Sequence, residues 1–208
     1  MTGSFNLENI LCAAGAAHAL DIPSHQIKKG VEDCVTIPGR LEKIDSPIDR
    51  FLFVDYAHTP GALESILMTL KKRAPKRIIT VFGCGGDRDR SKRPLMGQVA
   101  CRHSHIAIVT SDNPRTEHPD SIINDILKGM DGFHKLSEND LLLHPFKKGY
   151  LVEVDRKKAL KKAIFISKPG DIIIAAGKGH ETYQITNAGT IHFDDKEEFI
   201  KAAQKFAN

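Results

Sequence analysis

Apolar residues in this chain gather in short consecutive runs that are bounded by glycine, proline or charged residues. Most of these runs do not alternate with polar residues, which is typical of strands buried on both faces, as in a parallel sheet covered by helices. The pattern therefore predicts an α/β fold built on an open, mostly parallel sheet. The five runs with the length of a strand are residues 51–54, 78–82, 106–109, 151–154 and 172–175.

Stretches with helical periodicity lie between these runs, at 60–73, 94–103, 119–129 and 156–167. Pro94 and Pro119 suit the first turn of a helix, where the missing N–H costs nothing. Alternating strands and helices predict repeated β-α-β units, so we expect a Rossmann-like sheet with helices on both faces. A C-terminal β-hairpin over 184–193, with its turn at 187–189, and a last helix to about Phe206 complete the prediction.

The first part of the chain has a different pattern. Two helices are expected at 7–20 and 25–34, and the change to short strands follows the breakers Pro38 and Gly39. We therefore expect two units, residues 1–36 and residues 37–208.

Composition limits the class of protein. The chain has 208 residues, of which 41% are hydrophobic and 27% charged, and its net charge of +4 is scattered along the sequence. This mild excess suits acidic small molecules better than nucleic acid. No apolar run approaches the roughly 20 residues of a membrane span, and no leader pattern is found, so we expect a cytoplasmic protein with no membrane contact. Four cysteines without C-x-x-C spacing predict reduced thiols, and no histidines have metal-ligand spacing.

Loops that follow the strands are the place to look for a ligand, because they meet at the carboxyl edge of such a sheet. After the first predicted strand, Asp55 has the chemistry to accept sugar hydroxyls and His58 to donate to an anion. A capped helix start explains the same residues.

The loop at 83–94 begins like a dinucleotide fingerprint, but Arg88 stands in the place of the last glycine, which argues against a dinucleotide. Its basic residues suit a carboxylate or phosphate, or form a solvated charge run. In the next loop, Asn113 and Arg115 suit an amino acid's amine and carboxylate, although Asn is also a routine turn residue.

The loop at 176–181 fails as a phosphate loop, because Lys178 is followed by glycine and not by Ser or Thr. We predict that this glycine-lined loop, with Glu181, receives an ammonium group. A tight turn carrying a surface glutamate is the alternative.

Together, five motifs in this order resemble the C-terminal part of the Mur ligases, which form amide bonds in bacterial cell-wall precursors. The motifs are Gly39-Arg40-Leu41-Glu42, Asp55-Tyr56-Ala57-His58-Thr59-Pro60, Gly85-Gly86-Asp87-Arg88-Asp89 with Lys92-Arg93-Pro94, Asp112-Asn113-Pro114-Arg115 and Gly177-Lys178-Gly179-His180-Glu181. Residues 3–9 are similar to the end of the family's central ATPase domain. The resemblance implies that residues 1–36 are the last helices of that domain and 37–208 the amino-acid-binding domain. It also implies a C-terminal piece that is inactive alone, because the upstream phosphate loop is not found.

The resemblance implies a reaction in which ATP, with Mg²⁺, phosphorylates the free carboxylate of UDP-N-acetylmuramoyl-L-alanyl-D-glutamate. An amine of meso-2,6-diaminopimelate then attacks the acyl phosphate. No catalytic residue and no metal ligand is expected in this chain, and a monomer is expected. The residues implied for diaminopimelate are Arg88, Asp112, Asn113, Pro114, Arg115, Gly177 and Glu181. Those implied for the nucleotide are Asn6, Asn9, Arg40, Asp55 and His58.

Alternatives from the same family are the lysine-adding ligase, the ligase that recycles murein tripeptide, and cyanophycin-type or folylpolyglutamate-type enzymes. Arg115 argues against lysine, which lacks a second carboxylate. An alternative from another class is a module that binds amino acids or nucleotides without catalysis.

Overall fold

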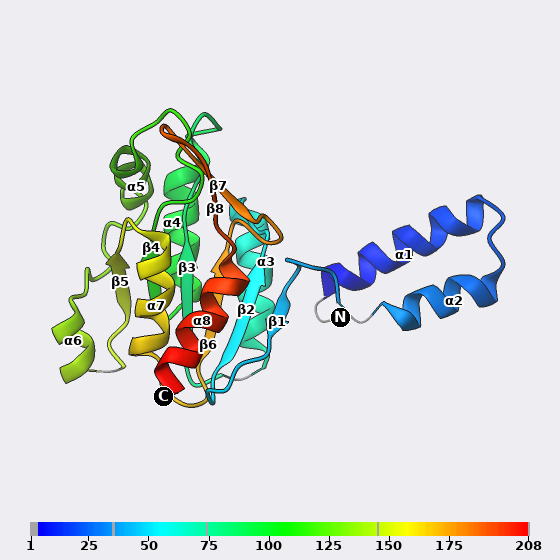
Figure 1. The fold of residues 1–208 in the computed structure, drawn as a ribbon, viewed down its shortest axis with the longest axis horizontal. Helices are drawn as coiled ribbons and strands as arrows, with labels where there is room; N and C mark the ends of the chain where they lie inside the picture. Colours follow the sequence, from blue (N-terminus) through cyan, green and yellow to red (C-terminus); the bar gives the residue numbers. More distant parts are fainter. Residues whose placement is uncertain (1–3, 35, 74, 145, 208) are drawn as a thin grey trace.

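A six-stranded sheet forms the centre of the computed structural model, which describes residues 4–34, 36–73, 75–144 and 146–207. The strand order is β1-β2-β6-β3-β4-β5, and all neighbours are parallel except β1, which is antiparallel to β2 (Figure 1). The predicted parallel sheet is confirmed. The strands are β1 Glu42–Ile44, β2 Phe51–Asp55, β3 Ile78–Phe82, β4 Ile106–Val109, β5 Gly149–Val152 and β6 Ile172–Ala176.

Helices cover both faces of the sheet, as the consecutive apolar runs require. Every residue of β3 and β6 is buried, and the strands' apolar side chains divide between two hydrophobic clusters, one on each face. On one face lie α7 (Arg156–Ile166) and α8 (Asp195–Ala207). The other face carries α3 (Pro60–Lys71), α4 (Lys92–His103) and α5 (Pro119–Leu127).

The elements expected at both ends of the chain are confirmed. The hairpin is formed by β7 (Tyr183–Thr186) and β8 (Gly189–His192), and α8 follows it. Near the N-terminus, α1 (Ser4–Ala19) and α2 (Ser24–Asp33) lie against each other to the side of the sheet (Figure 1). An apolar groove of about 350 Å³ runs between α1 and α2. The assignment of residues 1–36 to a separate domain stays a prediction.

One predicted strand needs correction, and two short elements were not predicted. The strand predicted at 151–154 is β5, two residues earlier, because Gly149–Val152 pairs with Ile106–Val109 and Val154 already leads into Asp155, which caps α7. Glycine begins this strand because a side chain does not fit there: a methyl group on Gly149 would lie 2.2 Å from the His134 carbonyl oxygen. Neither β1 nor α6 (Glu138–Leu143) was predicted, since each is too short to show a period.

The amino edge of the sheet is held by a buried ion pair. Arg77 Nε donates to Asp171 Oδ2 over 3.0 Å, and both side chains are almost fully buried. The end of α8 lies at the same edge, where the Arg50 guanidinium is 4.8 Å from the centre of the Phe206 ring. Among the described residues, no helix has the length and apolar content needed to cross a membrane.

Candidate functional site

Two arginines from neighbouring loops meet at the carboxyl edge of the sheet. A methyl group on Gly85 would lie 2.8 Å from Arg115 Nη1 and 3.8 Å from Arg88 Cγ, so both side chains border the same glycine. Arg115 Nη1 donates to the carbonyl oxygens of Gly86 (2.8 Å) and Asn113 (3.4 Å). Its own backbone has φ of 53° and donates to the Ile185 carbonyl of β7 over 3.1 Å. The guanidinium is therefore anchored on the backbone, while Arg88 is exposed.

A buried arginine ties these two loops together. Arg93, whose side chain is 0% exposed, donates to both carboxylate oxygens of Glu117 (2.6 and 2.9 Å) and to Asp125 (3.1 Å). Glu117 also accepts from the Asp87 backbone N–H over 2.7 Å. The hydrogen bond from Arg93 lowers the pKa of Glu117 to about 2. The clamp holds the Arg88 loop in register with the Arg115 loop.

A cluster of polar groups lies next to the arginine pair. Asn113 Nδ2 donates to Glu181 Oε2 over 2.8 Å, and Asn113 is buried. Lys178 Nζ donates to the same Glu181 oxygen over 3.1 Å and to Asn113 Oδ1 over 3.3 Å. The ammonium is also 3.7 Å from Asp112 Oδ1. The cluster thus joins the loop after β4 to the loop after β6.

Two glycines with left-handed backbone explain why Lys178 points inward. Gly177 has φ of 117° and Gly179 has φ of 55°, conformations that favour glycine. A methyl group on Gly179 would lie 2.7 Å from Tyr56 Cβ, so this turn also packs tightly against the loop after β2. In this setting the Gly-Lys-Gly sequence places its lysine inside the protein and does not present it to a phosphate.

Asp112 lies beneath the cluster. Its side chain is buried, and a methyl group on Gly177 would lie 3.4 Å from Asp112 Oδ2. Burial raises the pKa of Asp112, while the positive charges of Arg156 and Lys178 act in the opposite direction. Asp112 therefore shapes the charge of the site from below.

A second pocket of about 280 Å³ opens beside this site, lined by Asn9, Arg40, Asp55 and His58 among others. The Arg40 guanidinium lies 4.5 Å from the centre of the Tyr56 ring, and His58 meets that ring edge-on at 4.8 Å. Both carboxylate oxygens of Asp55 are engaged by the backbone N–H groups of Leu41 (2.6 Å) and Ala57 (2.7 Å). A cation and aromatic surfaces therefore line this pocket.

The predicted site residues divide into two groups in space. All seven predicted for diaminopimelate lie in the loops after β3, β4 and β6, and four of the five predicted for the nucleotide line the second pocket. Asn6, the fifth, is buried on α1. Sequence reasoning missed Lys178 and Tyr56. Glycines on both sides of the lysine, and an aromatic residue directly after a strand, were the available signals.

Neither a metal centre nor a disulfide is seen in the described part of the chain. No group of three or more His, Cys, Asp or Glu side chains there could hold a metal ion. All four cysteines are free, as predicted.

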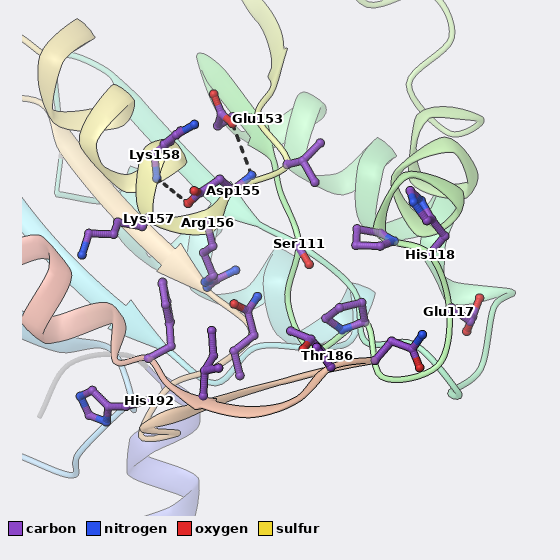
Figure 2. Close-up of a pocket in the computed structure, with 18 of the residues that line it drawn as sticks. Ser111, Glu117, His118, Glu153, Asp155, Arg156, Lys157, Lys158, Thr186 and His192 are labelled. Carbon is purple, nitrogen blue, oxygen red and sulfur yellow. Dashed lines mark hydrogen bonds between the residues drawn. The ribbon is translucent and has the colours of Figure 1, made fainter.

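A cavity of about 910 Å³ lies on the other side of the hairpin (Figure 2). Figure 2 shows Arg156, Lys157 and Lys158 on its α7 side and Thr186 and His192 on its hairpin side. Gln184 lines this cavity and donates to the Asp112 carbonyl over 2.5 Å, so the hairpin separates the cavity from the polar cluster. Both acidic and basic side chains line this cavity, among them Glu153 and Lys157.

Comparison with known proteins agrees with the motifs. A family model described as Mur ligase, glutamate ligase domain, matches residues 39–179, and the chain belongs to this family. The resemblance inferred from the five motifs is confirmed.

Curated relatives are named more specifically. The chain is 46% identical over 210 residues to the UDP-N-acetylmuramoyl-L-alanyl-D-glutamate–2,6-diaminopimelate ligase of Geobacter metallireducens, covering 100% of this chain and 41% of that protein. It is 47% identical over 197 residues to the ligase of the same name from Clostridium perfringens, covering 94% and 37%. A solved structure of a ligase of this name matches with a TM-score of 0.73 and 38% identity, over 100% of this chain and 40% of that one. The chain thus spans about two fifths of the length of these relatives.

Proposed function

We propose that this chain supplies the amino-acid-binding part of an ATP-dependent ligase that adds meso-2,6-diaminopimelate to UDP-N-acetylmuramoyl-L-alanyl-D-glutamate. The relatives at 46% and 47% identity carry the name of this activity. The observation that carries the proposal is the pair Arg88 and Arg115 beside the cluster of Asn113 and Glu181. Residues 1–36 would belong to the ATPase domain and 37–208 to the amino-acid-binding domain.

Diaminopimelate has an amino acid group at each end, so one end can react while the other is held. A planar guanidinium binds a carboxylate through two parallel hydrogen bonds, which suits Arg115 with Arg88 beside it. Glu181 and the Gly177 carbonyl would accept from the ammonium group of the same end. Asp112 and Pro114 shape this subsite from beneath and from the side.

ATP would occupy the second pocket, between Arg40 and His58, with Asn9 at its edge and Asn6 nearby. Arg40 supplies a positive charge and Tyr56 an aromatic face. Asp55 would act through the backbone that it holds, since both its oxygens are already engaged. ATP would phosphorylate the dipeptide's carboxyl group and leave as ADP. The amine at the free end of diaminopimelate, whose other end is held in the first subsite, would then attack the acyl phosphate and release phosphate. Positioning and charge neutralisation are sufficient for this step.

Mg²⁺ would accompany ATP, and no group of three or more His, Cys, Asp or Glu side chains among the described residues could hold it as a separate metal centre. A monomeric, cytoplasmic protein acting on small molecules is consistent with this function.

The test is a titration of the ¹⁵N-labelled chain, followed by NMR, with meso-diaminopimelate, L-lysine and L-glutamate in parallel. We expect diaminopimelate to shift the resonances of Arg88, Asn113, Arg115 and Glu181 at the lowest concentration. Tighter binding of lysine or glutamate would assign the chain to a sibling ligase. Binding of none of the three would overturn the proposal. A titration with ATP should shift Tyr56 and His58 instead.

A further inference from the structure

Lys178 is the feature of the site that the proposed function does not use. Its side chain is 0% exposed, although moving an ammonium group out of water costs several kcal/mol unless partners compensate. Its partners are Asn113 Oδ1 at 3.3 Å, Glu181 Oε2 at 3.1 Å and Asp112 Oδ1 at 3.7 Å. The Tyr183 ring closes the remaining side, with its centre 5.6 Å from Nζ.

These partners divide the two oxygens of Glu181 between two roles. Oε2 accepts from both Lys178 Nζ and Asn113 Nδ2. Oε1 receives no hydrogen bond from any residue in the described part of the chain, and the Glu181 side chain is partly exposed. One oxygen is therefore pinned from below, and the other is left for a ligand.

The charges of the cluster lead to the same conclusion. When Asp112 and Glu181 are both ionised, these two carboxylates and the Lys178 ammonium group together carry a single negative charge. Arg156 also acts on Asp112, but its guanidinium is paired with the buried carboxylate of Asp195, so this pair adds no net charge. One negative charge matches one substrate ammonium, whereas two neighbouring carboxylates with no cation between them would favour protonation of one of them.

We propose that Lys178 is the positioning residue of the amine subsite, an inference that rests on the proposed function. Lys178 holds Glu181 with Oε1 facing the substrate, and it sets the subsite's charge to that of one bound ammonium group. The Lys178 side chain itself does not touch the substrate. The left-handed backbone of the two glycines on either side, Gly177 and Gly179, lets this turn direct the Lys178 side chain inward.

The first experiment uses the wild-type chain, so it does not depend on the folding of a variant. The ¹⁵Nζ resonance of Lys178 should move together with the backbone amide resonance of Glu181 as meso-diaminopimelate is added, and it should not move when ATP is added. An unmoved Nζ resonance, in a chain whose Glu181 and Arg115 resonances do respond to diaminopimelate, would overturn the inference while leaving the proposed function intact.

The second experiment compares Lys178→Met and Lys178→Ala with Lys161→Met, a matched change at an exposed lysine of α7. Loss of the hydrogen bonds from Lys178 that hold Glu181 and Asn113 in place should weaken diaminopimelate binding by about tenfold or more in the Lys178→Met variant, with ATP binding changed less than about twofold. Adding propylammonium should restore part of the diaminopimelate binding of Lys178→Ala, because it can fill the same place with the same charge.

The outcomes separate the competing explanations. Equal weakening of diaminopimelate and ATP, together with a lower unfolding midpoint and no rescue by propylammonium, would make Lys178 a purely structural residue and refute the inference. Wild-type affinity in Lys178→Met would refute it as well. A wild-type chain that binds no diaminopimelate would instead refute the proposed function.

Discussion

Arg115→Lys tests the assignment of the distal carboxylate most directly. Arg115 uses Nη1 to bind the carbonyl oxygens of Gly86 and Asn113, and its Nε and Nη2 donate to no described residue. The free edge of the guanidinium is therefore available for a carboxylate. Lysine keeps the charge, but its single ammonium cannot hold the two backbone carbonyls and also present a planar pair of donors.

The magnitude follows from the lost contact. A hydrogen bond to a charged group contributes about 1.5 to 3 kcal/mol, and about 1.4 kcal/mol corresponds to a factor of ten. We therefore expect kcat/KM for diaminopimelate to fall by about 10- to 150-fold. L-Lysine has no second carboxylate, so its low activity should change far less. The KM for ATP should stay nearly constant, because Arg40 and His58 line a separate pocket.

The assay uses a hybrid ligase, in which this chain replaces the matching 41% of the Geobacter metallireducens relative. Phosphate release is measured with diaminopimelate and with L-lysine as the amino acid. Arg102→Lys, at an exposed arginine of α4, is the matched control and should behave as the parent hybrid. Equal losses for both amino acids would show that Arg115 supports the loop itself, and its role toward the distal carboxylate would have to be abandoned.

Three further predictions concern the chain alone. The hydrogen bond from buried Arg93 lowers the pKa of Glu117 from 4.5 to about 2. The ion pair therefore stabilises the folded state above pH 4.5, and this stabilisation is lost as the pH falls toward 2. Urea unfolding of Glu117→Gln should therefore show a lower free energy of unfolding at pH 6 and a weaker pH dependence of that free energy between pH 2 and pH 4.5. An unchanged pH profile of unfolding would rule out a stabilising Arg93–Glu117 pair. Burial raises the pKa of the Cys84 thiol to about 12, so iodoacetamide at pH 8 should label the exposed Cys12 and leave Cys84 unlabelled by mass spectrometry, and rapid labelling of Cys84 would contradict its burial. Gly179→Ala should destabilise the chain by more than the roughly 1 to 3 kcal/mol of backbone strain, because the added methyl also meets Tyr56, whereas Gly132→Ala, with positive φ but open space, should cost only the strain; equal losses would argue against the tight packing.

The central strands could be predicted because burial on both faces requires consecutive apolar residues, as in Ile172–Ala176. The prediction placed strand β5 two residues too late. Gly149 begins this strand because the His134 carbonyl oxygen, in another segment, leaves no room for a side chain there. Pairing with a distant segment leaves no local pattern in so short a strand.

The sequence could predict which loops carry the proposed site residues, but it could not predict the directions of their side chains. Arg115, Asn113 and Glu181 are brought together where the loops were expected to meet. Asp55, read as facing a ligand, has both oxygens bound to backbone N–H groups, and Lys178 points inward. Side-chain direction in a loop depends on backbone dihedrals, which residue type restricts but does not determine.

The C-terminal end of α8 lies at the amino edge of the sheet, which makes it a suitable place to attach the chain to a surface. α8 ends beside Arg50, which immediately precedes β2, so this end of the helix lies a full strand length from the loops that follow β2 and β6 (Figure 1). A biotin tether joined after α8 would hold the chain on a sensor surface with its ligand-facing edge directed into solution. Small-molecule affinities could then be compared between variants on one chip without the tether shielding the loops.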